Sequence, residues 1–257
     1  MTRPVLVPVR VLEGESVPSA LIETLAPVPI VLLGYHVVPE QTAPGQARLQ
    51  FEERARTELD DLRDSVDAAG GSVETRLVFT HDATTTIERV AVEEDAGSIL
   101  LSNPAPAVDR VLVALSAAIN LDRIAGVVSL LVADTGLPVT LYHATASAAD
   151  RDAAADLLSD FGSRLVDRGV DAAAITTRVD VTETPERDVI AVASEFDLVV
   201  VGESEPELLD RVFGDFPQRL ADESLTPTLV VRRLVEAGPR AGADDDTDES
   251  GDGADGE

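Results

Sequence analysis

The sequence contains no cysteine, no lysine and no tryptophan, and aromatic residues make up only 3% of its 257 residues. The absence of cysteine excludes a disulfide framework, thiol chemistry and cysteine-ligated metal sites. No apolar run approaches the ~18 residues that a membrane span requires, and residues 1–4 lead into a short apolar run without a secretory signal. We therefore expect a soluble, cytoplasmic protein without a membrane partner.

Positive charge is also scarce, because 48 acidic residues face 20 basic ones, all of them arginine, for a net charge of −28. Such a charge repels phosphate backbones, so no nucleic-acid partner is expected. With 44% hydrophobic residues the chain can still bury a core. An acidic surface without lysine is typical of halophilic proteins, since concentrated salt screens the self-repulsion. A G- and C-rich genome that disfavours lysine codons is the alternative explanation.

The chain repeats itself after about a hundred residues. Segments 5–10, 29–36 and 84–101 recur as segments 111–116, 138–143 and 184–201. Two copies of this size are domains, which we place at residues 3–103 and 110–236, with a proline-containing linker at 104–109. Residues 237–257 hold eight acidic residues, one arginine and no apolar periodicity, which predicts a disordered, solvating acidic tail.

Within each copy, short β-branched apolar runs alternate with helical patterns. The apolar spacing predicts one helix that stops at Gly70-Gly71, a second that ends at Gly169, and a third between an Asn120 cap and Gly136. Strands that read as continuous apolar runs are buried on both faces, as in a parallel sheet with helices on each side. The predicted fold class is α/β, with two doubly wound parallel-sheet domains in tandem.

This order of motifs resembles the universal stress protein family, repeated twice. The matching segments are VLVPVR and VLVALS, then PIVLLGYHVVP and PVTLYHA, and finally DLVVVGE, RVFGD and TPTLVVRR. The resemblance implies the adenine-nucleotide-binding fold of that family. Many members bind ATP through Gly-x-x-Gly, nine residues and then Gly-Ser/Thr, with an aspartate ending the first strand. Such a loop holds phosphate with backbone N–H groups and a hydroxyl.

The second copy departs from this signature at most of its positions. Gly202 is retained, but Glu205 replaces the second glycine and only eight residues separate it from Gly214. Asp215 occupies the hydroxyl position, and Ser116 replaces the first-strand aspartate. Ser116, Gly202, Gly214 and Asp215 are therefore predicted positions of a degenerate nucleotide site.

Carboxylates around a triphosphate are costly. Each like-charge pair at ~4 Å costs roughly 4 kcal/mol at an effective dielectric near 20, and Glu203, Glu205 and Asp215 all lie in this segment. We therefore predict that ATP binding is lost or weak and that no cofactor is bound. ATP with magnesium, bridged by Asp215, is the alternative. In the first copy Arg10 replaces the aspartate, and the glycine loop, fourth helix and fifth strand are missing.

Other candidate residues have simpler explanations. His36 and His143, which we place at matching strand ends, are predicted to be structural or to line the cleft. His81-Asp82 reads as a surface turn, and Arg232-Arg233 as partners of a neighbouring acidic face. No Ser-His-Asp order, nucleophile elbow or metal-ligand spacing is present.

The functional prediction is a non-enzymatic stress-response protein that acts by association with a protein partner whose identity the sequence does not reveal. A nucleotide-binding protein or slow ATPase is the alternative. A pyrophosphatase-type synthetase of the same fold is disfavoured, because VALSAAIN lacks the serine-glycine-rich loop. In the family the fifth strand pairs across a dimer. The strand from Thr228 to Arg232 is therefore predicted to cover the edge at 98–101, as an internal pseudo-dimer, or else to form a homodimer.

Overall fold

The computed structural model describes residues 2–116, 120–203 and 215–233. The strands of this part are β1 (Val5–Arg10), β2 (Ile30–Val37), β3 (Val73–Thr80), β4 (Ser98–Leu101), β5 (Val111–Ala114), β6 (Val139–Thr145), β7 (Ile175–Val181), β8 (Leu198–Gly202) and β9 (Thr228–Val231). The α-helices are α1 (Ser19–Leu25), α2 (Pro44–Ala68), α3 (Ala83–Glu93), α4 (Leu121–Val132), α5 (Arg151–Val166), α6 (Pro185–Ala193) and α7 (Asp215–Ser224). The predicted α/β class is confirmed.

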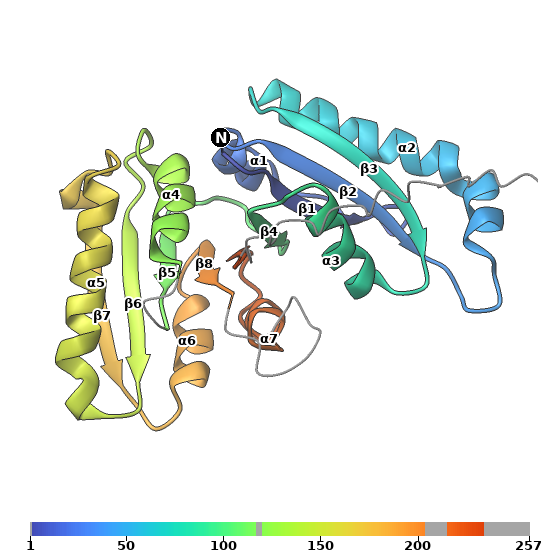
Figure 1. Ribbon diagram of the computed structural model, residues 1–257. Coiled ribbons are helices and arrows are strands. Elements are labelled where there is room, and N and C mark those ends of the chain that lie inside the picture. Colours follow the sequence, from blue (N-terminus) through green and yellow to red (C-terminus); the bar gives the residue numbers. More distant parts are fainter. Residues whose placement is uncertain (1, 117–119, 204–214, 234–257) are drawn as a thin grey trace, which may run out of the picture.

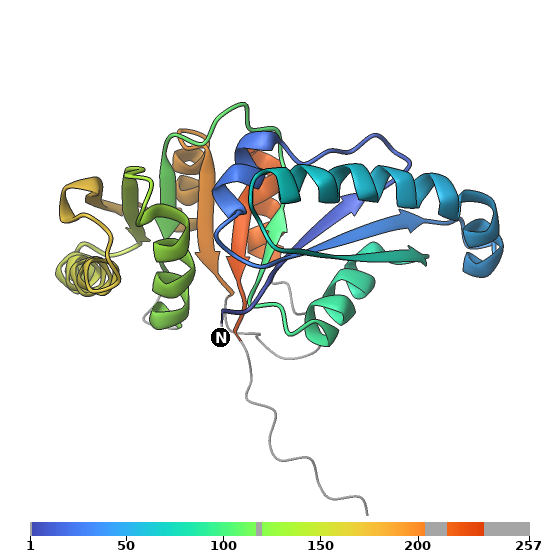
Figure 2. The same cartoon turned by 90° about the horizontal axis from the view of Figure 1, so that it is seen from above.

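All nine described strands form one continuous sheet, in the order β3-β2-β1-β4-β9-β8-β5-β6-β7. Figures 1 and 2 show β1–β4 with their helices on one side and β5–β8 with theirs on the other. We call β1–β4 with α1–α3 the first half, and β5–β9 with α4–α7 the second half. Each half is parallel within itself and repeats one strand order. The boundaries of the two predicted domains stay a prediction.

The sheet is covered on both faces, because alternate residues of each central strand point to opposite sides. Val5 and Val7 of β1 belong to a core cluster that contains residues of α1, α2, α4 and α5 and extends through both halves. Leu6 packs in a second cluster, against α3. A third cluster lies under α6 and α7. Ala105 and Val108, in the predicted linker, are buried in the shared cluster.

Strand β9 joins the halves. It runs parallel to β8, with Val199 opposite Thr228, and antiparallel to β4, with Ser98 opposite Val231. The predicted cover of the 98–101 edge by the strand from Thr228 to Arg232 is therefore confirmed, with β9 itself ending at Val231. Because β9 reverses direction relative to β4, the carboxyl ends of the parallel strands lie on opposite rims of the sheet in the two halves.

The helix boundaries follow the predicted stop signals. Gly70, Gly136 and Gly169 all adopt positive φ after their helices, a conformation that glycine adopts without steric cost. The predicted Asn120 cap is correct in position and wrong in mechanism. Asn120 is left-handed (φ 58°) and its side chain makes no capping hydrogen bond, because a side-chain cap requires extended backbone at this residue. None of the described helices has the length and apolar character to cross a membrane.

Candidate functional site

Two of the predicted site residues, Ser116 and Gly202, lie at the carboxyl rim of β5 and β8. Ala114 lies opposite Val201, so Ser116, just past β5, and Gly202, the last residue of β8, stand at the ends of two adjacent parallel strands. In doubly wound folds this is the rim at which ligands bind. Asp215 is the first residue of α7. Gly214 lies outside the described residues, as do Glu205 and residues 117–119.

Gly202 has a packing role that the nucleotide signature does not require. Its φ is not positive, so the residue is not needed for a left-handed turn. A Cβ at this position would lie 3.0 Å from Cδ1 of Ile124 on α4, which is tighter than ordinary van der Waals contact. Gly202 therefore allows α4 to approach the end of β8 closely, whether or not a ligand binds.

Glu203 follows Gly202 and is held by β9 and the residues after it. Its N–H donates to the carbonyl of Val231 (2.9 Å), and its carboxylate accepts a hydrogen bond from the N–H of Arg233 (2.6 Å). Burial raises the pKa of this carboxyl, a shift that Arg233 opposes. The carboxylate of Glu203 thus already accepts a hydrogen bond from a backbone N–H group at this rim.

The corresponding rim of the first half repeats this arrangement with different residues. The N–H of Arg10, at the end of β1, donates to the Glu15 carboxylate, and the N–H of Leu12 donates to the Glu58 carboxylate, both at 2.7 Å. Leu12 itself is left-handed (φ 73°). The Arg10 Nε donates to the hydroxyl of Tyr35 (3.0 Å). In this rim, too, acidic side chains accept hydrogen bonds from backbone N–H groups.

Sequence reasoning missed these acceptors. Glu58 lies 46 residues from Leu12 and Glu203 lies 30 residues from Arg233, so neither contact has a local signal. Only the short spacing of Glu15 from Arg10 resembles a turn, and nothing in that spacing specifies the acceptor.

Two donors without a partner among the described residues lie at the start of α4, which follows β5. Asn120 and Arg123 stand at the start of α4, and their atoms Nδ2 and Nη1 are buried without a hydrogen-bond partner among the described residues. Both groups are hydrogen-bond donors, and within the part of the chain that the structure describes nothing accepts from them.

The histidines do not converge. His143 Nδ1 donates to the carbonyl of Leu115 (2.6 Å), which ties β6 to the end of β5. His36 packs against the rings of Phe51 and Phe79, each with its centroid 5.9 Å away. The expectation of matching strand ends is wrong. Ala114 pairs with Tyr142 as Pro8 pairs with Leu33, so His143 is level with Gly34, two residues before His36.

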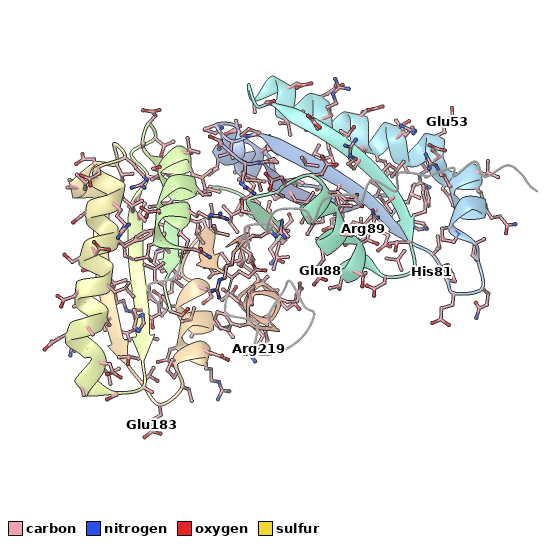
Figure 3. The ribbon with its side chains drawn as sticks, in the orientation of Figure 1. Glu53, His81, Glu88, Arg89, Glu183 and Arg219 are labelled. Atoms are coloured by element: carbon pink, nitrogen blue, oxygen red, sulfur yellow. The ribbon has the colours of Figure 1, made fainter. Side chains whose placement is uncertain are left out.

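His81 lies in the bend between β3 and α3, where Figure 3 labels it, and Asp82 caps α3 by accepting from the N–H of Thr85. The predicted surface turn is confirmed. Among the described residues, no group of three or more His, Asp or Glu side chains is arranged to hold a metal ion.

Arg232 differs from its prediction as a partner of an acidic face. Its Nη1 donates to the carbonyls of Ala91 (2.9 Å) and Ala96 (3.0 Å), at the C-terminus of α3. The side chain is 5% exposed, so backbone carbonyls hold this cation inside the molecule. The physical reason is position, because β9 brings Arg232 against the end of a helix in the other half.

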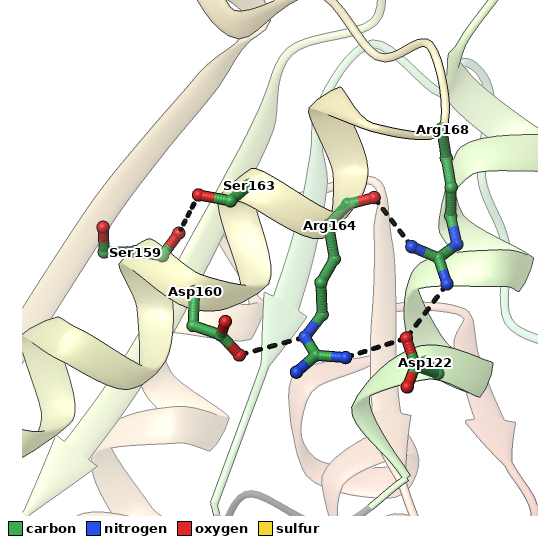
Figure 4. Close-up of polar contacts among 6 residues, drawn as sticks. All are labelled: Asp122, Ser159, Asp160, Ser163, Arg164 and Arg168. Carbon is green, nitrogen blue, oxygen red and sulfur yellow. Dashed lines mark hydrogen bonds and ion pairs between the residues drawn. The ribbon is translucent and has the colours of Figure 1, made fainter.

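Ion pairs on the outer helix faces are of the ordinary solvated kind. Asp122 on α4 accepts from Arg164 (2.8 Å) and Arg168 (3.0 Å) on α5, and Asp160 also pairs with Arg164, as Figure 4 shows. The two pairs with Asp122 join α4 to α5, whereas the pair between Arg164 and Asp160 lies within α5. Exposed pairs of this type each contribute little to stability.

Two surface hollows lie away from the candidate rim. One, of about 440 Å³, lies between α5 and the edge strand β7 and is lined in part by Leu158, Gly162 and Ile175. The other, of about 250 Å³, lies between α2 and the edge strand β3 and includes Leu59 and Leu77. Both sit at the outer margins of the sheet and include none of the predicted site residues.

No protein-family model matches this sequence, and no curated protein matches it. Solved structures do. A universal stress protein from Archaeoglobus fulgidus DSM 4304 superposes with a TM-score of 0.59 and 17% identity, over 90% of this chain and 96% of that one. A putative universal stress protein from Pseudomonas aeruginosa UCBPP-PA14 gives 0.54 and 15%, over 90% and 93%. The chain therefore has the α/β fold of solved universal stress proteins.

Proposed function

We propose that this chain is a tandem, cytoplasmic stress-response protein of the universal stress type, non-enzymatic, which acts by association with another protein. In this proposal its ATP site is degenerate and no cofactor is resident. One observation carries it: at both carboxyl rims, carboxylates of the chain accept hydrogen bonds from backbone N–H groups at or just past the strand ends.

The electrostatics of the second-half rim support this proposal. A phosphate group near the N–H of Arg233 would have to displace Glu203 or lie beside it. Each like-charge contact at ~4 Å costs roughly 4 kcal/mol at an effective dielectric near 20. Losing a single backbone hydrogen bond costs about 1 kcal/mol, so the repulsion is the larger obstacle.

The test is calorimetric titration of the full chain with ATP and Mg²⁺ in molar KCl. We expect no saturable heat from the natural chain. Micromolar affinity would overturn the proposal. The Glu203→Gln variant, which keeps the shape and an acceptor oxygen but removes the charge, should bind at least as well as the natural chain.

The alternative is a nucleotide-binding protein or slow ATPase that uses the second half. Asn120 and Arg123 favour it, because their unpartnered nitrogens at the start of α4 are the donor type that phosphate oxygens accept from. In this reading Gly202, Gly214 and Asp215, with Mg²⁺, would complete the site beside Ser116. If ATP does bind, Arg123→Met should weaken its affinity at least tenfold, whereas Arg63→Met, an exposed site on α2, should leave it unchanged.

A further inference from the structure

The seam between the halves consists of one strand that both halves use. Thr228–Val231 pairs with β4 along one edge and with β8 along the other, and all four of its residues are buried. The first half has no strand of its own at this position. Its β4 edge is therefore completed by the second half.

The chain leaves β9 through Arg232, which enters the first half. Its N–H donates to the carbonyl of Gly97 (2.9 Å), extending the pairing with the first half by one residue beyond Val231. Its guanidinium then donates to the carbonyls of Ala91 and Ala96. Three hydrogen bonds thus run from this one residue to the corner between α3 and β4.

That corner is suited to receive a cation. Asp95 is left-handed (φ 50°), and the N–H of Ala96 bonds back to Ala91, so α3 ends in a Schellman-type turn. The carbonyls at a helix C-terminus carry partial negative charge and stabilise a positive side chain. Asp95 and Glu203 add favourable electrostatic attraction, while burial lowers the pKa of Arg232.

The burial of Arg232 makes its partners indispensable. Its Nε is buried without a hydrogen-bond partner among the described residues, so its compensation comes through Nη1 and the surrounding charges. A buried cation separated from its partners carries a large desolvation penalty. The first half therefore cannot separate from the second without exposing the β4 edge and freeing this charge.

We propose that Arg232 couples the two halves into one cooperative folding unit. Its buried side chain holds β9 of the second half against the end of α3 in the first half. Asn103 performs a lesser, similar task at the other end of the seam. Its Nδ2 donates to the carbonyls of Ala221 (3.0 Å) and Thr226 (3.3 Å), and it carries no charge.

The two tyrosines of the chain provide one probe in each half, Tyr35 on β2 and Tyr142 on β6. Tyr142→Phe leaves a reporter in the first half only, and Tyr35→Phe leaves one in the second half only. Thermal unfolding of the full chain followed by tyrosine fluorescence in molar KCl then gives a midpoint for each half. With Arg232 present, the two midpoints should coincide.

In the Arg232→Met background, which keeps a long apolar side chain without donors, the two midpoints should separate by about 5 °C or more. The Arg63→Met background, which loses only an exposed pair with Asp67, should leave them coincident. Midpoints that fall together in Arg232→Met would overturn the proposal, because they would show a stabilising residue that does not couple the halves.

If Arg232→Met does not fold, Arg232→Lys serves instead. It retains the charge with a less suitable donor geometry and should show a smaller separation, and coincident midpoints there would overturn the proposal as well.

Discussion

At the scale of single residues, the main feature is the placement of carboxylates where backbone donors lie. Glu15, Glu58 and Glu203 come from three different elements or loops, yet each accepts an N–H group at a strand end. The high acidity of the chain is therefore more than a property of its surface, because some of its carboxylates are part of the rims.

Glu203 gives a prediction on pH. Its folded-state pKa is raised by burial, so the folded state binds a proton more readily than the unfolded chain does. Stability should therefore fall as pH rises from the ordinary glutamate range through the raised value, and the loss persists at neutral pH. Glu203→Gln, which carries no charge at any pH, should unfold at a higher temperature than the natural chain at pH 7, because the raised pKa means that the cost of burying the carboxylate exceeds its attraction to Arg232 and Arg233.

The advantage of Glu203→Gln should shrink as the pH falls towards 4. Thermal scans of both proteins across this range measure it. A difference that stays constant with pH would show that the effect comes from packing rather than from ionisation. Glu53→Gln on the exposed face of α2 is the matched control, labelled in Figure 3, and its effect should be small.

Residue-scale prediction from sequence succeeded where the signal is local. The glycines after α2, α4 and α5 identified helix ends, because positive φ is a property of the residue itself. The sequence could not identify Glu58 or Glu203 as acceptors, nor the carbonyl partners of Arg232, because those contacts depend on how distant elements meet. The offset between His36 and His143 escaped prediction because strand register is set by pairing. The two repeated segments, 29–36 and 138–143, also differ in length.

At the scale of elements, β9 is a short strand that contributes more to the stability of the fold than its length implies. Leu229 is fully buried in the cluster shared by both halves, whereas Leu225, four residues earlier, is 67% exposed. The order of helices and strands, and the cover of β4 by this strand, were predictable from the repeat and its missing fifth strand. That the two halves share one continuous core was not, because it depends on three-dimensional packing across the seam.

This contrast gives a matched pair of leucines. Leu229→Ala should lower the free energy of unfolding by about 2–5 kcal/mol, because it removes a fully buried side chain and leaves a cavity. Leu225→Ala should change it by less than about 0.5 kcal/mol. Urea unfolding in molar KCl provides both values. Equal effects would contradict the buried position of β9.

At the scale of the whole molecule, both edges of the central strand are already paired. The continuous sheet leaves its free edges at β3 and β7, at its two outer margins. The centre of the sheet therefore has no unpaired backbone with which a second copy could align.

We accordingly expect the protein to be monomeric. Light scattering in molar KCl should give a mass near 27.1 kDa. A mass of twice this value would favour the homodimer alternative, and Arg232→Met should then be compared with the natural chain, since releasing β9 is the way for a homodimer to form through that strand.

The order of synthesis gives the shared strand a further consequence. The edge at β4 is complete in sequence by Leu101, but the strand that covers it ends at Val231, roughly 130 residues later. At about 5–20 residues per second, a ribosome needs about 7 to 26 seconds to supply it. During that interval the nascent chain exposes an apolar ladder that it cannot yet close. A chaperone that shields this edge would therefore be required for longer in this protein than in one whose first half brings its own final strand.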